Sequence, residues 1–127
     1  MTEIDVKMYS TIVPEYHPKG WGYELWLVNN EKYCGKILHF FLGKRCSYHF
    51  HKLKNEHFYV LKGSFLLKYG NTDDYKVASE KILKKGEVVE IPVGLRHQMI
   101  ALENDSEIIE ISTQHFEDDS YRLIKGD

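Results

Sequence analysis

The chain lacks the features that mark several common protein classes. Its 127 residues include two cysteines, Cys34 and Cys46, which cannot form a disulfide framework and are not spaced as a C-x-x-C pair. We expect Cys46 to act as a small buried hydrophobic residue. No apolar run approaches the roughly 20 residues that span a membrane, and residues 1–16 show no signal peptide. These absences predict a cytoplasmic protein.

An excess of charge of one sign is also lacking. The 17 basic and 19 acidic residues are spread along the chain and give a formal net charge of -2. Without a basic block or stripe, nucleic acids and anionic membranes are poor candidate partners. The composition is 43% hydrophobic and 13% aromatic, which supplies one core, and no repeat or linker divides the chain. We therefore expect a single domain over residues 1–127.

Helical periodicity is scarce, so the regular structure is predicted to be β-strand. Short runs rich in Val, Ile, Phe and Tyr alternate with turn signals built from Gly, Asn and Asp. Their regular spacing is typical of an antiparallel sandwich or barrel, which is an all-β fold. The predicted strands cover residues 23–28, 35–42, 47–51, 56–62, 64–69, 76–83, 88–91, 97–101 and 108–112.

Histidine, by contrast, is frequent, with seven in the chain. In an extended strand His49 and His51 lie on one face, about 7 Å apart, with Phe50 on the other. After a short loop, Glu56 opens the next predicted strand and can rejoin that face. Two imidazoles and a carboxylate that converge in this way suit a transition metal, which takes neutral nitrogen and carboxylate oxygen together.

A second segment can deliver a fourth ligand. The run GEVVEIPVGLRH has the skeleton G-x5-P-x-G-x2-H and ends at His97. Pro92 cannot donate to a strand ladder and Gly94 permits a sharp bend, so the chain leaves one strand here and enters another at His97. His97 can thus face the first histidine pair from an opposite strand.

These two skeletons, G-x5-H-x-H-x4-E-x6-G from Gly43 and G-x5-P-x-G-x2-H from Gly86, resemble the two motifs of the cupin superfamily in order and spacing. The second departs at its last position, where Ala101 stands and the family often has Asn. The resemblance implies a cupin jelly-roll β-barrel, also called a double-stranded β-helix. It also implies one divalent transition metal ion (Zn, Mn, Fe or Ni) held by His49, His51, Glu56 and His97.

A finer resemblance is to the type II phosphomannose isomerases and their single-domain relatives. It involves the stretch GKRCS…H…NEHF, the Trp-Gly entry at residues 19–24, a lysine at Lys36 and the closing segment LENDSEIIEISTQHFEDDSYRL. It covers roughly residues 19–123, which sets the core of the domain and leaves residues 1–18 as an N-terminal arm. His49 stands where those isomerases typically have glutamine. The residues carried over from the closing segment are Glu110, Asp118, Asp119 and Arg122.

This resemblance implies a metal-dependent aldose–ketose isomerase that acts on a sugar or sugar phosphate. A base must move a proton between C1 and C2, and the candidates are Glu110 and Lys36. Candidates for contact with a phosphate are Lys36, Arg45 and Arg122. Two other classes remain open: a sugar-binding cupin without catalysis, and an iron-dependent cupin dioxygenase or lyase.

The remaining histidines are expected to have ordinary roles. A lone histidine in a strand is usually solvated, which we expect of His17, His57 and His115. His39 lies in mid-strand and is expected to be either a satisfied core histidine, which we favour, or a residue that lines a cavity. The resemblance also implies a homodimer. The segment Ile12-Val13 and the aromatic residues Trp21, Tyr23 and Trp26 are predicted to form a swapped strand or interface, or to close one end of the barrel.

Overall fold

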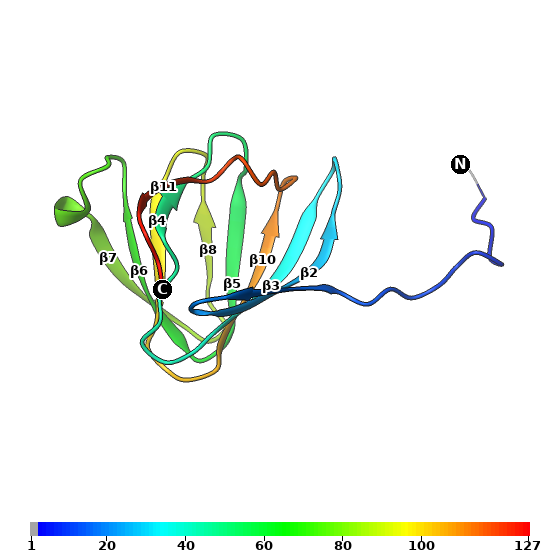
Figure 1. Cartoon of the computed structure of the whole chain (residues 1–127), viewed down its shortest axis with the longest axis horizontal. Helices are drawn as coiled ribbons and strands as arrows, with labels where there is room; N and C mark the ends of the chain where they lie inside the picture. The colour runs from blue at the N-terminus through cyan, green and yellow to red at the C-terminus, as the bar shows by residue number, and fades with distance from the viewer. Residues whose placement is uncertain (1–2) are drawn as a thin grey trace.

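The computed structural model describes residues 3–127 and consists of two antiparallel sheets that face each other (Figure 1). The six-stranded sheet has the order β1-β2-β3-β10-β5-β8 and the five-stranded sheet the order β11-β4-β9-β6-β7. The strands are β1 (Glu15–Lys19), β2 (Gly22–Asn29), β3 (Cys34–Phe40), β4 (Tyr48–Phe50), β5 (Glu56–Lys62), β6 (Ser64–Gly70), β7 (Ser79–Lys84), β8 (Val88–Ile91), β9 (Arg96–Ala101), β10 (Ser106–Ser112) and β11 (Tyr121–Ile124). This arrangement is the predicted cupin jelly roll in a single domain.

Alternation along the strands sets which side chains enter the barrel. In β5, Glu56, Phe58 and Val60 are buried while His57 between them is exposed. The two-residue period of a strand therefore places the polar Glu56 on the same inner face as the apolar residues that follow it. The predicted metal ligand Glu56 thus lies on the same face of β5 as the core residues.

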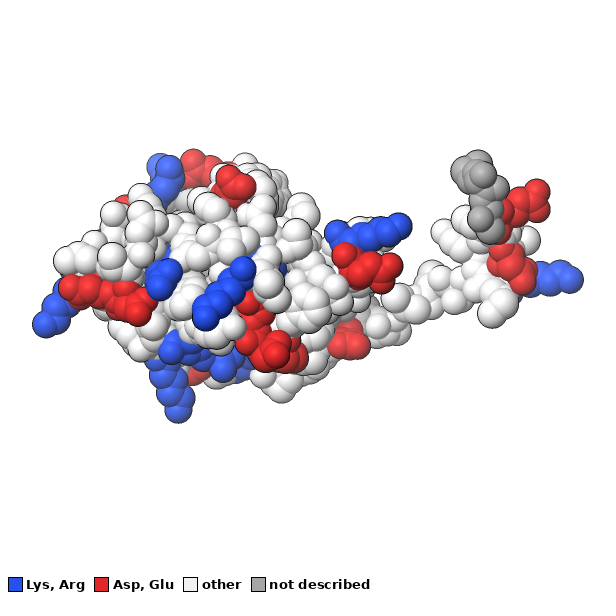
Figure 2. Space-filling model, turned by 90° about the horizontal axis from the view of Figure 1, so that it is seen from above, with Lys and Arg blue, Asp and Glu red and all other residues white. Residues whose placement is uncertain are grey.

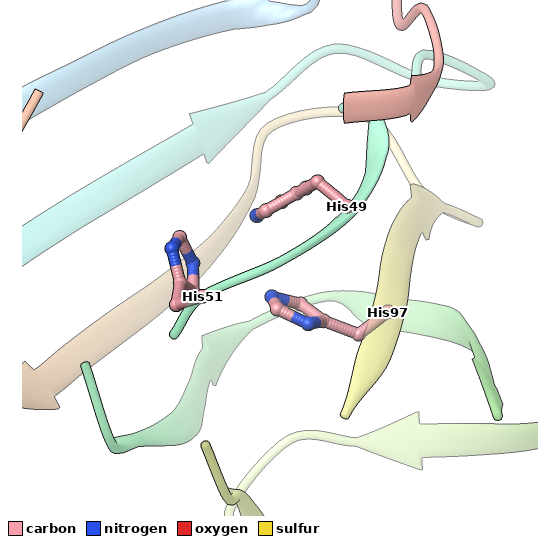
Figure 3. A group of neighbouring side chains, drawn as sticks. All are labelled: His49, His51 and His97. Atoms are coloured by element: carbon pink, nitrogen blue, oxygen red, sulfur yellow. The ribbon is translucent and has the colours of Figure 1, made fainter. Parts of the chain in front are cut away.

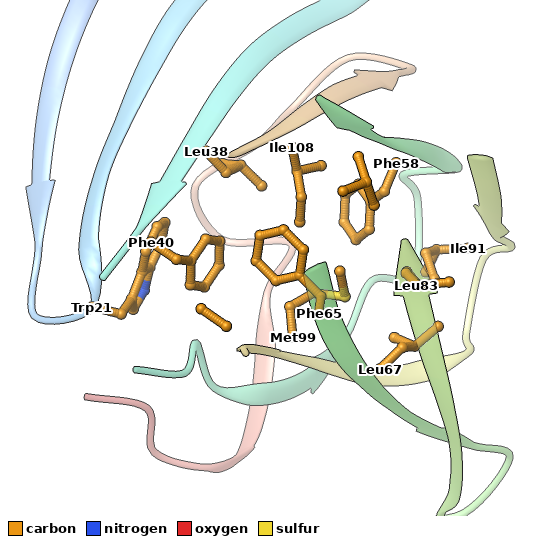
Figure 4. Close-up of a cluster of buried hydrophobic side chains, with 12 residues drawn as sticks. Trp21, Leu38, Phe40, Phe58, Phe65, Leu67, Leu83, Ile91, Met99 and Ile108 are labelled. Atoms are coloured by element: carbon orange, nitrogen blue, oxygen red, sulfur yellow. The ribbon is translucent and has the colours of Figure 1, made fainter. Parts of the chain in front are cut away.

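The core lies between the two sheets (Figure 4). Aromatic rings meet there, with Trp21 stacked on Phe40 at 4.1 Å and Phe40 edge-on to Phe65 at 5.1 Å between ring centroids. Phe65 and Ile108 are fully buried. Along β3 and β9 the buried residues near this aromatic group are apolar, Phe40 and Ala101, while the buried polar residues Lys36 and His97 lie toward the other end of the same strands.

All nine predicted strands are present, and the structure adds β1 and β11 at two sheet edges. Most predicted boundaries differ from the structure by no more than two residues, and the largest difference is at the start of β7. Residues 75–77 form a short 3-10 helix instead of the start of β7, because the side chain of Asp74 accepts a hydrogen bond from the Lys76 backbone N–H at 3.0 Å and caps that turn. Strand β7 therefore begins at Ser79.

Residues 3–14 extend away from the barrel as an arm (Figures 1 and 2). Their side chains are exposed, including Ile12 and Val13, and the chain joins the sheet only at β1. Part of the arm predicted over residues 1–18 is therefore strand, and residues 1–2 lie outside the described residues. Acidic and basic side chains both occur over the face shown in Figure 2. Between residues 3 and 127, no helix has the length and hydrophobicity needed to cross a bilayer.

Candidate metal centre

Three histidines converge at the polar end of the barrel (Figure 3). His49 lies in β4 and His51 directly after it, while His97 lies in β9 and is the cross-strand partner of His49. One ring nitrogen from each of the three lies within 4.8 Å of the others. The structure thus brings His97 to the pair His49 and His51, which lie 48 and 46 positions earlier in the chain, as the sequence predicts.

The other ring nitrogen of each histidine is held by the backbone. In all three rings Nδ1 lies within hydrogen-bond distance of a carbonyl oxygen, so Nδ1 carries the proton and Nε2 presents its lone pair. Such backbone partners orient ligating imidazoles and raise their basicity. The pairs are His49 with Ser47 at 2.9 Å, His51 with Asp119 at 2.7 Å and His97 with Leu95 at 2.9 Å.

Glu56 is a candidate fourth ligand from the opposite sheet, beside the cluster of three histidines. Its Oε2 atom lies 3.4 Å from His51 Nε2 and 3.2 Å from His97 Nε2. All three atoms are buried and, among the described residues, none has a hydrogen-bond partner. Unpartnered buried polar atoms are costly, and one divalent cation would satisfy all of them at once. The donor set therefore fits the metal that the sequence predicts.

The protonation states of the site also suit a metal. Burial lowers the pKa of His49 well below its usual value, and the neighbouring His97 and His51 lower it further. For Glu56, burial raises the pKa, but the contacts with His51 and His97 and the charge of Lys54 outweigh this and hold it well below its usual value. Neutral imidazole and ionised carboxylate are the forms that ligate metal ions.

A cavity of about 300 Å³ opens beside the histidines, and the predicted base candidates line it. One inward-facing row crosses four strands in the order Trp26, Lys36, Glu110 and Phe58, each the cross-strand partner of the next. Lys36 and Glu110 are 2% and 4% exposed, so both belong to the buried wall. Burial and the charge of Glu56 raise the pKa of Glu110, while Lys54 and Lys36 oppose the rise.

Sequence reasoning missed Lys54. It lies in the loop between β4 and β5, yet only 3% of it is exposed, and its Nζ atom lies 3.1 Å from Glu56 Oε1, from Glu110 Oε2 and from His115 Nδ1. The run KLKNE has the composition of a solvated loop. Its one feature that points to the site is that Lys54 stands two positions before the predicted ligand Glu56. The charges of Glu110 and Glu56 outweigh the effect of burial and raise the pKa of Lys54, so its ammonium stays charged.

The expectation that His115 is solvated was wrong. Its side chain is 13% exposed, lines the cavity and contacts Lys54. Burial, with the nearby charges of Lys36 and Lys54, lowers the pKa of His115 to about 3. His17 is likewise partly covered, because its ring stacks on Trp26 at 3.9 Å between centroids.

The other two histidines behave as expected. His57 is exposed. His39 is buried and satisfied, with Nδ1 2.7 Å from Glu107 Oε2 and Nε2 2.9 Å from Asp105 Oδ1. Cys46 packs partly buried against the core, as predicted, and burial raises the pKa of its thiol to about 12.

The residues carried over from the isomerase resemblance have different locations. Arg122 lies in β11 opposite His49 and lines the cavity, whereas Arg45 is exposed and is not among the lining residues. Asp118 is exposed. Asp119 is buried and its carboxylate accepts hydrogen bonds from the backbone N–H groups of residues 52–54, so it supports the loop that carries Lys54.

The aromatic residues in and just before β2 lie on two different faces of the sheet. Trp21 and Trp26 line the cavity, and Trp26 donates to Glu24 at 2.8 Å. Tyr23 lies on the other face of β2, where its ring stacks on His39 at 4.6 Å between centroids. The two tryptophans therefore help to form the cavity wall.

Solved structures of three proteins share this architecture. CapF, a capsular polysaccharide assembling protein from Staphylococcus aureus, is 23% identical with a TM-score of 0.78, over 94% of this chain and 35% of that chain. KdgF from Halomonas sp. is 20% identical with a TM-score of 0.65, over 76% and 81%. Oxalate decarboxylase from Bacillus subtilis is 18% identical with a TM-score of 0.75, over 91% and 33%. This chain therefore spans about a third of the CapF and oxalate decarboxylase chains.

At these identities the likeness to solved structures concerns the fold alone. No curated protein sequence matches the chain significantly. A family model described as Cupin matches residues 45–123, which is more than half of the chain and includes all four ligand positions. With the jelly-roll topology and the histidine centre already described, this match establishes that the chain belongs to the cupin family.

Proposed function

We propose that the protein is a metal-dependent isomerase that interconverts the aldose and ketose forms of a sugar or sugar phosphate. The observation that carries this proposal is a buried carboxylate, Glu110, linked through Lys54 to the metal ligand Glu56 at the wall of a cavity. The cavity volume of about 300 Å³ is at the small end for ligand pockets, which suits one sugar unit.

The ligand set supports this chemistry. A bound divalent ion supplies Lewis acidity to a substrate carbonyl and to the negative charge that develops on its oxygen. Four protein ligands leave about two positions of a six-coordinate ion for vicinal oxygens of a sugar. His49, His51, His97 and Glu56 would hold the ion.

Glu110 is the base that this proposal assigns. Proton transfer between C1 and C2 needs a group near the substrate whose pKa approaches the working pH. Burial and the charge of Glu56 raise the pKa of Glu110 in that direction. Its Oε2 atom accepts from Lys54 and from Ser112, so Oε1 is the oxygen assigned to take up and return the proton.

Two basic residues at the cavity wall are assigned to substrate binding. Lys36 is buried, with its ammonium 4.2 Å from the Trp26 ring centroid and 3.7 Å from Glu24 Oε1, at the cavity wall. Arg122 lines the same cavity from β11. A guanidinium suits a phosphate or carboxylate, so we assign Arg122 to an anionic group of the substrate.

The test loads the protein separately with Mn, Zn, Fe or Ni and follows pairs of aldoses and ketoses, with and without phosphate, by NMR. We expect conversion with at least one metal and its loss in Glu110→Gln, with bound metal retained. Glu90→Gln, at an exposed carboxylate in β8, is the matched control and should convert normally. Sugar binding without conversion would instead favour a binding protein, and oxygen uptake with iron would favour a dioxygenase.

A further inference from the structure

We propose that Lys54 is a positioning residue that restricts Glu56 to one-oxygen coordination of the metal. Keeping the second carboxylate oxygen away from the ion leaves a coordination position for substrate. This inference rests on the metal centre of the proposed function, and it is independent of the isomerase reaction.

The first observation is that the two oxygens of Glu56 have different partners. Oε1 is paired with the Lys54 ammonium at 3.1 Å. Oε2 points to His51 and His97 and has no hydrogen-bond partner among the described residues. Glu56 is 1% exposed, so its two oxygens keep these different surroundings inside the protein. The carboxylate is thus divided into an oxygen for the ammonium and an oxygen for the metal.

The second observation is that the ammonium is fixed in place. Lys54 Nζ also lies 3.1 Å from Glu110 Oε2 and 3.1 Å from His115 Nδ1. An ammonium has three donors, and these three contacts occupy all of them. The backbone N–H of Lys54 donates to Asp119 Oδ2 at 3.1 Å, which holds the loop itself. Lys54 therefore cannot release Glu56 without giving up a fully satisfied buried position.

The consequence concerns the number of open positions on the metal. A carboxylate binds a cation through one oxygen or through both. With three imidazoles and one oxygen, a six-coordinate ion keeps two positions, but a second oxygen from Glu56 would leave only one. Two vicinal sugar oxygens need two positions. The ion pair with Lys54 thus keeps open the two coordination positions that a chelating substrate requires.

The test titrates the cobalt(II)-loaded protein with acetohydroxamate, a chelating ligand that needs two open coordination positions, and follows the change in visible absorption. Lys54→Met keeps a long side chain but removes the ammonium. We expect Lys54→Met to bind cobalt and to bind acetohydroxamate about tenfold more weakly than the wild type, because the second oxygen of Glu56 fills one of the two positions that the chelating ligand needs. Lys52→Met is the control, since Lys52 lies in the same loop but is exposed and stacks over the Tyr121 ring.

A double variant guards against loss of folding. Lys54→Met leaves two buried carboxylates without their shared cation, whereas Lys54→Met combined with Glu110→Gln removes one charge of each sign. The double variant should show the same loss of acetohydroxamate affinity as the single variant.

Three outcomes would overturn the inference. Unchanged acetohydroxamate affinity in either folded variant would show that Lys54 does not control the coordination mode. Loss of cobalt from both variants would show that Lys54 supports metal affinity instead. Failure of the wild type to bind cobalt through its histidines would overturn the metal centre, and with it the proposed function.

Discussion

At the scale of single residues, the metal centre depends on which nitrogen of each imidazole carries the proton. In all three rings Nδ1–H donates a hydrogen bond to a backbone carbonyl, so each Nε2 is left for the ion. His51 depends on the most distant partner, the carbonyl of Asp119, which is 68 positions away in the chain. The ligand geometry is therefore set by residues that are not ligands.

Removal of two ligands should abolish metal binding. We expect His51→Ala combined with His97→Ala to lower the metal content, measured by elemental analysis, from about one equivalent per chain to near zero. The control is His57→Ala, which removes an exposed histidine from the other face of β5 and should retain the metal. Full metal content in the double variant would contradict the assigned site.

A buried carboxylate beside the site should contribute strongly to stability. Asp119→Ala removes the acceptor for the backbone N–H groups of residues 52–54, so we expect the free energy of unfolding in urea to fall by about 3 kcal/mol. The neighbouring Asp118→Ala changes an exposed residue and should alter it by less than about 0.5 kcal/mol. Equal effects of the two substitutions would refute the assigned role of Asp119.

The ligands were predictable at this scale, but Lys54 and His115 were not. His49 and His51 follow the two-residue period of a strand, and a spacing rule needs no knowledge of tertiary contacts. The burial of Lys54 depends on Glu110, which is 56 positions away in the chain, and on a loop conformation held by Asp119. No local pattern encodes those partners.

At the scale of elements, the turns between strands set the register of the inner face. Gly63 joins β5 to β6 with φ of 71°, and a Cβ atom there would collide with the side chain of Ser106. Gly86 joins β7 to β8 with φ of 89°, and nothing lies within 4 Å of its Cβ position. The two glycines share a backbone conformation and differ in the space around them.

This difference predicts unequal costs for the same substitution. Gly86→Ala should lower the free energy of unfolding by about 1 kcal/mol through backbone strain alone. Gly63→Ala adds a steric clash beside a core strand, so we expect about 3 kcal/mol. Chemical denaturation of the two variants measures both values, and a smaller loss at Gly63 than at Gly86 would contradict the structure.

The elements that sequence reasoning missed are strands at sheet edges. β1 contains Pro18, which removes a donor and weakens any strand signal, yet an edge position tolerates it. β11 is mostly exposed and lacks an alternating apolar pattern, so only its pairing with β4 identifies it. The interior strands were predictable because each has its own buried face.

At the scale of the whole molecule, the side chains that are candidate metal ligands are divided between the two sheets. His49 and His97 belong to the five-stranded sheet, while Glu56 belongs to the six-stranded sheet. A bound ion therefore links the two layers at the end of the barrel opposite the aromatic core. Any ion or molecule that binds only the folded state stabilises that state by mass action.

Metal removal should therefore lower the stability of the entire domain. At a free metal concentration of 100 times Kd, the expected contribution is about 2.7 kcal/mol, or about 10 °C in Tm for a domain of this size. Calorimetry with added metal and with a chelator measures the shift. The variant lacking His51 and His97 should show no difference between the two conditions, and a wild type without a shift would contradict a link between the sheets.

The same link has a kinetic consequence. The ligand positions are separated by as many as 48 residues, from His49 to His97, so the ion meets its full ligand set only after distant strands have docked. A contact that forms after the folding barrier slows unfolding and leaves the refolding rate unchanged. In stopped-flow experiments, added metal should lower the rates of the unfolding limb alone, which would make the ion a latch that closes last and opens first.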